Sequence, residues 1–293
     1  MSSAALRLAT SSLPAESALS EADYERLASV LNGRLGIKLP SAKRGMLEMR
    51  LRGRIRQLGF ADHDAYCQHL FNQGGLADEM QHLVDAVTTN KTDFFREPEH
   101  FVVLRDLLVP NLIAARRAEH QPLIKLWSAA ASIGAEAYTI AMVLEDLLRS
   151  RADFRYAILG TDVSSRVLDQ ARDAVYTSDM VMPVPSAMKE RYLLWPLYRA
   201  QGSAVRISPE LRRMARFAPL NLMDASYPFD RDVDVVFLRN VLIYFERPDQ
   251  EAVILRLMGH LRPGGYLILG HSETAIGTAM GLKQVAPSVF QRA

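Results

Sequence analysis

The sequence predicts an α/β fold: a parallel sheet built from strand–helix–strand units, with a helical N-terminal domain and a small antiparallel β-subdomain inserted into it. Three observations predict it. Apolar strands alternate with helices from about residue 122 onward. Residues 20–86 show helical periodicity only. Between residues 176 and 220 the alternation stops, and several prolines precede two short β-like runs.

The composition is that of an ordinary folded protein. A chain of 293 residues, 49% hydrophobic and 23% charged, is long enough for one large domain with a smaller partner domain. Its apolar runs are shorter than the roughly 20 residues that cross a bilayer, so we expect no direct membrane insertion. Residues 1–19 lack the apolar core of a signal peptide, which predicts a flexible leader on a cytoplasmic protein. A single cysteine, Cys67, excludes an intrachain disulfide and a cysteine-based metal cluster.

Helix signals divide the N-terminal domain, residues 20–86. Ser20 has the position of an N-cap, and a second helix over residues 41–58 ends at Gly59. A third helix is predicted over residues 62–71, with a fourth after a short loop. The apolar residues Leu47, Leu51, Ile55 and Leu58 of the second helix recur on one stripe, which predicts the buried face.

The charge of the chain is unevenly distributed. A net charge of only +2 argues against a general nucleic-acid binder. Residues 33–58, however, contain one acid, Glu48, among a group of basic residues: Arg34, Lys38, Lys43, Arg44, Arg50, Arg52, Arg54 and Arg56. A local basic surface of this kind indicates an acidic partner.

The α/β pattern extends over residues 122–293 and is preceded by a linker and connecting helix over residues 87–121. We expect strands at residues 123–130, 156–161, 233–238 and 266–270, and helices at residues 134–149, 164–174 and 248–261. The insertion, residues 176–220, contains β-like runs at 204–208 and 214–218. A closing strand is expected at residues 283–291.

Ligands of open α/β sheets bind at the carboxyl ends of the strands, near the point where the strand order reverses. Glu136 lies in the first turn of the helix after the first strand, behind a run of small residues. Its carboxylate could bind a cationic group of a ligand, or it could simply be stabilised by the positive amino end of the helix dipole. Asp162 directly follows the second strand, where it could bind ribose hydroxyls or cap the next helix. The residues alone leave both choices open.

Two further segments carry polar groups near this edge. Residues 239–245 follow a very apolar strand and include Asn240 and Tyr244, although core packing is the better reading of the aromatics taken alone. Residues 88–97 join the two domains and contain Asn90, Thr92 and Arg96, which could equally be solvated. The two prolines of the motif typical of base-methylating enzymes are absent, which also argues against nucleic acid.

Taken together, these segments resemble the CheR family of chemotaxis methyltransferases. The matching strings lie in family order at residues 88–97, 127–138, 161–162, 221–222, 239–245, 262–265 and 270–273. The resemblance implies a Rossmann-like S-adenosylmethionine-dependent methyltransferase sheet, the helical N-terminal domain and the inserted β-subdomain. It also implies S-adenosylmethionine as cofactor, with S-adenosylhomocysteine as product and no metal ion.

The resemblance assigns roles residue by residue. Cofactor contacts fall on Asn90, Thr92, Arg96, Glu136, Asp162, Asn221, Leu222, Asn240 and Val241. Arg96 and Tyr244 become the polar neighbours of the transferred methyl group. The receptor-facing basic helix corresponds to Lys43, Arg50, Arg52, Arg54 and Arg56, so the implied partner is the cytoplasmic domain of a chemoreceptor, with a monomer as the default state.

The implied reaction forms glutamate methyl esters on chemoreceptors, which sets sensory adaptation. Glutamate is ionised at pH 7, so its attack on an activated methyl group needs no general base. Arg96 would position the carboxylate, and Tyr244 would donate a hydrogen bond near the reaction centre. Ile133, Ala135 and Ala137 depart from the family pattern. They favour one alternative, a catalytically weakened regulatory relative that binds adenosyl compounds or nucleotides. A third reading is a methyltransferase for small molecules or nucleic acid; the modest net charge weighs against nucleic acid, and the basic helix weighs against a small substrate.

Overall fold

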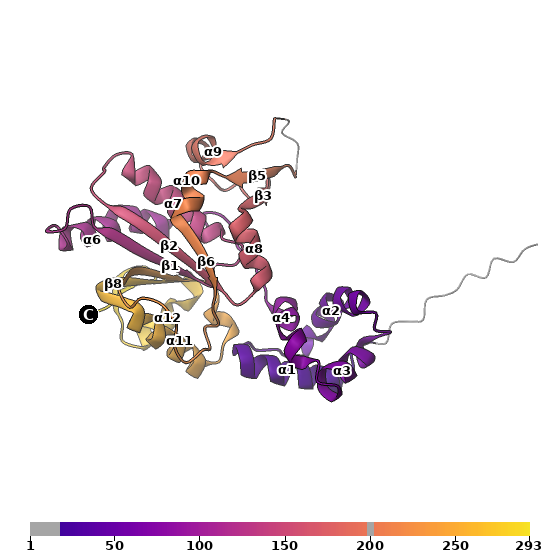
Figure 1. Cartoon of the computed structure of the whole chain (residues 1–293). Coiled ribbons are helices and arrows are strands. Elements are labelled where there is room, and N and C mark those ends of the chain that lie inside the picture. Colours follow the sequence, from indigo (N-terminus) through magenta and orange to yellow (C-terminus); the bar gives the residue numbers. More distant parts are fainter. Residues whose placement is uncertain (1–17, 198–201) are drawn as a thin grey trace, which may run out of the picture. The chain divides into compact units, whose positions relative to one another are not determined.

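The structure is a computed structural model that describes residues 18–197 and 202–293 (Figure 1). The chain divides into two compact units. The first contains the residues up to Ser29 together with Leu39–Val87, and the second contains Val30–Lys38 together with Thr88–Ala293. Most of the expected leader, residues 1–17, lies outside the described residues.

The first unit is helical, as predicted. It contains most of α1 (Glu21–Leu35), a 3-10 turn η1 (Ser41–Lys43), α2 (Arg44–Leu58), α3 (His63–Asn72) and α4 (Leu76–Val87). Ser20 Oγ accepts a hydrogen bond from Asp23 N at 3.1 Å, which confirms the first N-cap. Gly59 ends α2 in the left-handed conformation with φ 76°. Leu47, Leu51 and Ile55 form the buried stripe, whereas Leu58 at the end of the helix is exposed, contrary to the prediction.

The second unit alternates strands and helices. Its helical elements are α5 (Glu99–Val103), the π-helical turn η2 (Leu104–Leu108), α6 (Val109–Ala115), α7 (Ala135–Leu148), α8 (Ser165–Asp173), α9 (Ser186–Tyr192), α10 (Pro209–Met214), η3 (Leu242–Tyr244), α11 (Arg247–His260), η4 (His271–Glu273) and α12 (Thr274–Ala279). Its strands are β1 (Leu123–Ala129), β2 (Arg155–Asp162), β3 (Val175–Thr177), β4 (Leu193–Leu194), β5 (Ala204–Ile207), β6 (Ala215–Pro219), β7 (Val233–Leu238), β8 (Leu261–Leu269), β9 (Lys283–Ala286) and β10 (Val289–Gln291). The alternation confirms the predicted fold class.

Seven strands form the main sheet in the order β6-β2-β1-β7-β8-β10-β9. The first five are parallel, and β10 runs antiparallel to β8. Each face is covered by its own apolar core. Leu126 of β1 packs with side chains of α6 and α7, whereas Trp127 packs with those of α11 and α12. Adjacent residues of a strand point to opposite faces, so a near-continuous apolar strand is what a sheet covered on both sides requires.

The small antiparallel sheet has the order β3-β5-β4 and confirms an inserted β-subdomain. The prediction was wrong for residues 214–218, because β6 pairs in parallel with β2 at the edge of the main sheet. The Phe217 ring lies so close to Gly160 of β2 that a Cβ there would be 2.6 Å from it. Local sequence identifies a short strand, but its partner depends on such long-range packing.

Two other expectations need adjustment. The single closing strand at residues 283–291 is a hairpin of β9 and β10, because Ser288 between them takes a left-handed conformation with φ 58°. Residues 87–121, expected as a linker and connecting helix, do contain helical elements (α5, η2 and α6), but all of them except Val87 belong to the second compact unit.

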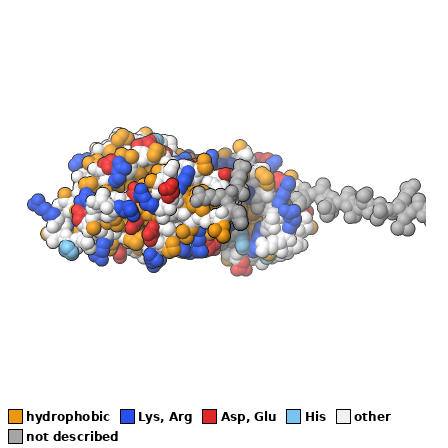
Figure 2. Space-filling model, turned by 90° about the horizontal axis from the view of Figure 1, so that it is seen from above, with side chains coloured by type: hydrophobic (Ala, Val, Ile, Leu, Met, Phe, Trp, Pro, Cys, Tyr) orange, Lys and Arg blue, Asp and Glu red, His pale blue; other side chains and the backbone are white. Residues whose placement is uncertain are grey.

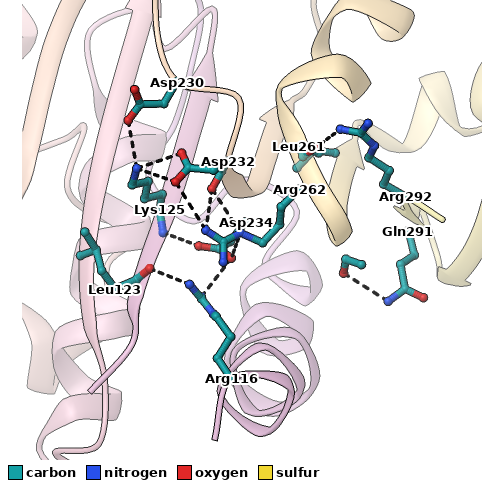
Figure 3. A network of polar contacts seen from close by, with 11 residues as sticks. Arg116, Leu123, Lys125, Asp230, Asp232, Asp234, Leu261, Arg262, Gln291 and Arg292 are labelled. Carbon is teal, nitrogen blue, oxygen red and sulfur yellow. Dashed lines mark hydrogen bonds and ion pairs between the residues drawn. The ribbon is translucent and has the colours of Figure 1, made fainter. Parts of the chain in front are cut away.

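The amino ends of the parallel strands meet in a buried ionic network (Figure 3). Asp234 of β7 is fully buried and accepts hydrogen bonds from Lys125 N at 2.7 Å and Arg116 Nη2 at 3.0 Å. Arg262 Nε lies 3.0 Å from the same carboxylate. This network joins β1, β7 and β8 to the chain after α6.

Among the described residues, no helix is both long and apolar enough to span a membrane. The face shown in Figure 2 carries interspersed Lys, Arg, Asp and Glu side chains, in keeping with the net charge of +2.

Candidate active site

The strand order reverses between β1 and β7. The chain passes from β1 to β2 on one side, and later returns to place β7 on the other side of β1. The loops after β1 and β7 therefore separate at the carboxyl edge, which is where open α/β sheets bind their ligands.

The loop after β1 is built from left-handed residues. Ala130, Ser132 and Gly134 have φ values of 58°, 51° and 85°. A Cβ on Gly134 would lie 2.9 Å from Ala171, so only glycine fits without a shift. Left-handed conformations at non-glycine residues cost about 1–3 kcal/mol each and cluster at ligand sites. The loop is tied to the end of β2, where Ala131 N donates to the Thr161 carbonyl at 2.8 Å.

Asp162 fastens this loop to the end of β2. Its two carboxylate oxygens accept hydrogen bonds from Ser132 N at 2.9 Å and Ser164 N at 3.0 Å. The N-cap of α8 is Ser164, whose hydroxyl accepts from Val167 N. The alternative that Asp162 caps this helix is therefore wrong.

The central charge of the site is Arg239, directly after β7. Its side chain is only 2% exposed, and its guanidinium donates to Glu136 Oε2 at 2.9 Å and Glu97 Oε2 at 3.1 Å. It also donates to the Arg96 carbonyl and lies 5.4 Å from the centre of the Phe101 ring. Its Nε is buried without a hydrogen-bond partner. Sequence reasoning missed this residue, although it opens the string at residues 239–245.

Glu97 and Glu136 share this one cation. Ser128 Oγ donates to the second oxygen of Glu136 at 2.7 Å, and Asn240 Nδ2 donates to the second oxygen of Glu97 at 3.1 Å. Burial acts to raise the pKa of Glu97, but the hydrogen bond from Asn240 and the charge of Arg239 outweigh it, so the pKa is lowered. Two carboxylates around one guanidinium leave a surplus of negative charge, which suits a cationic ligand.

Glu273 holds the loop after β7 in place. Its carboxylate accepts from Asn240 N at 2.8 Å, Leu242 N at 2.8 Å and Gly270 N at 2.9 Å. Burial raises the pKa of Glu273 despite these backbone donors. Asn240 is left-handed with φ 60°, a conformation that asparagine tolerates better than most residues. Gly270 is required because a Cβ there would lie 2.7 Å from Asn240 Nδ2.

The structure joins several of the predicted site residues directly. The Asn90 carbonyl accepts from Ser132 Oγ at 2.9 Å, so residues 88–97 do reach the loop after β1. Arg96 is half-buried and donates to the Lys91 carbonyl at 3.4 Å. On the same side of the candidate site, Glu136 forms its ion pair with Arg239 at 2.9 Å.

The remaining predicted residues lie on neighbouring loops. Asn221 Nδ2 donates to the Arg34 carbonyl at 2.7 Å, next to buried Leu222. Val241 and Thr92 are half-buried. Tyr244 ends η3, and its carbonyl accepts from Lys38 N at 2.9 Å. These contacts show where the five residues lie, but they do not show whether the residues bind the cofactor or act in catalysis.

The basic side chains of helix α2 fall into two groups: some bind other parts of the helical unit, and others are exposed. Arg54 donates to both carboxylate oxygens of Glu79, at 2.6 and 2.9 Å, and Arg50 donates to the Ala86 carbonyl at 2.9 Å. The hydrogen bond from Arg54 lowers the pKa of Glu79. Arg52 and Arg56 are exposed, with Arg52 paired to Glu48 on its own helix; Lys43 is half-buried. Part of the predicted docking surface thus stabilises the helical unit.

Comparison with known proteins identifies the chain. Residues 90–288 match the family model "CheR methyltransferase, SAM binding domain", and residues 22–88 match "CheR methyltransferase, all-alpha domain". The protein is an S-adenosylmethionine-dependent methyltransferase. It belongs to the CheR methyltransferase family, which confirms the resemblance seen in the sequence.

Curated relatives agree over nearly the whole chain. The chemotaxis protein methyltransferase of Borreliella burgdorferi is 32% identical over 92% of this chain and 94% of its own length. Chemotaxis protein methyltransferase 2 of Pseudomonas aeruginosa is 36% identical over 92% and 93%, and the Escherichia coli enzyme is 36% identical over 87% and 85%. The predicted function, S-adenosylmethionine-dependent methylation in chemotaxis, is confirmed at this level, and the alternatives are not favoured.

Proposed function

We propose that this enzyme forms methyl esters on glutamate side chains in the cytoplasmic domain of a chemoreceptor. The observation that carries the proposal is the carboxyl edge of the sheet, where Glu97 and Glu136 surround the buried cation Arg239. When bound there, S-adenosylmethionine supplies a methyl group on a sulfonium, which a carboxylate oxygen can take as the carbon–sulfur bond breaks.

The donor set of the site fits this cofactor. Glu136 and Glu97 provide negative charge for its cationic groups, and Asp162 provides a carboxylate for its ribose hydroxyls. The left-handed loop at residues 130–134 lets backbone approach closely. Ile133, Ala135 and Ala137 are all buried within the apolar core, so these departures from the family pattern are absorbed by packing. The predicted contacts at Asn90, Thr92, Arg96, Asn221, Leu222, Asn240 and Val241 stay part of this proposal.

The residues of the chain align the reactants and balance their charges, and they do not need to transfer a proton. A glutamate substrate is already ionised at pH 7. Arg96 helps to position that anion, and Tyr244 donates a hydrogen bond near the reacting oxygen. Holding the two reactants in line and excluding water supplies the acceleration.

The substrate class is supported by α2. Its outer face exposes Arg52 and Arg56 together with Met49, whose residue is 65% exposed. A Cβ added at Gly45 or Gly53 of the same helix would have nothing within 4 Å, so another helix can approach closely there. Such a face suits the acidic helices of a receptor. We expect Arg52→Glu with Arg56→Glu to weaken receptor binding, and added salt to do the same to the natural protein.

The reaction is tested with radiolabelled S-adenosylmethionine and a purified chemoreceptor cytoplasmic domain. Esters of glutamate release their label as volatile methanol in mild alkali, whereas N-methyl groups do not. We expect alkali-labile label that disappears with Arg96→Ala. Alkali-stable label, or no transfer by a protein that binds S-adenosylhomocysteine, would contradict the proposed chemistry or substrate.

A further inference from the structure

Beside the active site, Glu97, His100 and His271 converge from two distant segments. Each offers one ligand atom, and these atoms lie within 4.8 Å of one another. Glu97 lies two residues before α5, His100 lies in the first turn of that helix, and His271 opens η4 after β8. We call these three residues the histidine cluster.

His100 is the unusual member of the histidine cluster. The residue is 1% exposed, and both ring nitrogens are buried without a hydrogen bond. Its Nδ1 lies 3.4 Å from Glu97 Oε2, outside hydrogen-bond geometry. Buried polar groups are nearly always satisfied, and an unsatisfied one costs about 1–3 kcal/mol. A buried imidazole that lacks a hydrogen-bond partner among the described residues therefore points to an external ligand.

The spacing of the histidine cluster suits a metal ion. Zinc holds nitrogen and oxygen ligands at about 2.0–2.2 Å, so neighbouring ligand atoms of a tetrahedral site are about 3.3 Å apart. The Glu97–His100 separation of 3.4 Å matches this. The two imidazole rings are in edge-to-face contact, 4.9 Å apart between centres and inclined at 75°.

The surroundings of the histidine cluster provide access and a supporting carboxylate. The His271 side chain is 46% exposed and lines a surface hollow with Thr274 and Gln284, which opens the cluster to solvent. Glu99 Oε1 lies 3.2 Å from His271 Nε2, in the place of a supporting carboxylate.

We propose that the histidine cluster binds a divalent transition-metal ion of the zinc type through one carboxylate oxygen and two imidazole nitrogens. Three protein ligands leave a fourth position for water. Glu97 also holds Arg239 and Asn240, so the ion competes with them for this carboxylate and links metal binding to the active site. The nearby guanidinium opposes a second cation, so the site binds metal more weakly than a four-ligand structural site.

The test is a calorimetric titration of the untagged, chelator-treated protein with zinc chloride at pH 7.5. We expect one ion per chain, with affinity at least tenfold lower in His271→Ala. The matched control is His120→Ala, an exposed histidine outside the cluster, which is expected to bind zinc as the natural protein does. Absence of one-to-one binding, or equal affinity in His271→Ala and the natural protein, would overturn the proposal.

A spectroscopic readout separates loss of ligands from loss of fold. Cobalt(II) in place of zinc gives visible absorption bands that report nitrogen and oxygen ligands in a low-coordinate site. We expect these bands in the natural protein and in His120→Ala, and their loss in His271→Ala while circular dichroism stays unchanged. Cobalt spectra of an ordinary six-coordinate aqueous ion in the natural protein would also overturn the proposal.

Discussion

The two edges of the main sheet bury ions in opposite proportions. At the amino edge one fully buried carboxylate, Asp234, lies between Arg116 and Arg262 (Figure 3). At the carboxyl edge one buried guanidinium, Arg239, lies between Glu97 and Glu136. The charges of the first arrangement are balanced, because Arg262 also pairs with Asp232, and Lys125 pairs with Asp230 and Asp232. The second arrangement has a surplus of negative charge.

The backbone also distinguishes the two edges. Among the described residues, the left-handed non-glycine residues Phe95, Glu97, Ala130, Ser132 and Asn240 are found in segments that contact the carboxyl edge, while Gln121 is the one just before β1 at the amino edge. Buried ions alone are therefore a poor marker of function, because both edges have them. Unbalanced charge together with strained backbone marks the ligand site.

The largest expected effect is that of Arg239→Met. Removing this cation leaves Glu97 and Glu136 without a counter-ion, and breaking a buried pair costs about 3–5 kcal/mol. Urea unfolding should show this loss, and S-adenosylhomocysteine binding should disappear. Arg247→Met, which removes a half-exposed arginine paired on its own helix, should cost at most about 1 kcal/mol. Equal stability of the two variants would refute the central role of Arg239.

The carboxyl edge is tested for ligand binding by Glu136→Gln. Loss of one charge-assisted contact with the cofactor should weaken S-adenosylhomocysteine binding by about 1.5–3 kcal/mol, or roughly 10–150-fold. Calorimetry measures this. Glu145→Gln on the same helix is the control, because Glu145 lies away from this edge and accepts a hydrogen bond from Tyr156 Oη at 2.9 Å. Similar affinities in both variants would remove Glu136 from the site.

Asp234→Asn tests whether the amino edge is structural only. One or more of its hydrogen bonds is lost, so unfolding free energy should fall by about 1–3 kcal/mol. The affinity for S-adenosylhomocysteine should stay within about twofold of the natural value, because the network lies at the opposite ends of the strands. A large loss of affinity in a folded variant would end the distinction between the two edges.

The smallest effect is a pH dependence at Asp234. Burial raises its pKa above the usual value, against the hydrogen bond from Lys125 N and the charges of Arg116 and Arg262. The folded protein then takes up this proton at a higher pH than the unfolded chain. The stabilising contribution of protonated Asp234 is complete below the ordinary aspartate pKa of about 3.9. It is lost as the pH rises through the pKa of Asp234 in the folded protein.

The stability advantage of the natural protein over Asp234→Asn should therefore be larger at pH 4.5 than at pH 7.5, as measured by urea unfolding at both values. A larger advantage at pH 7.5 would mean that the two arginines dominate over burial.

Much of the fold could be predicted from local pattern. The apolar strand at residues 233–238, the helix that follows Gly134 and the capping of α8 by Ser164 all depend on residues close in sequence. Ordered motifs likewise predicted the family and the candidate residues at the carboxyl edge. Periodicity and capping act over a few residues, so a single sequence contains them in full.

Tertiary structure alone decided which residues meet. Arg239 joins Glu97 and Glu136 across more than a hundred residues, the histidine cluster unites residues 97 and 271, and β6 pairs with β2 rather than within the insertion. Arg54 likewise binds Glu79 of another helix, although the sequence pattern placed it on the surface that faces the receptor. Strand order and burial choose these partners, and the energy of a buried charge depends on the neighbours that the fold brings to it, which no local pattern records.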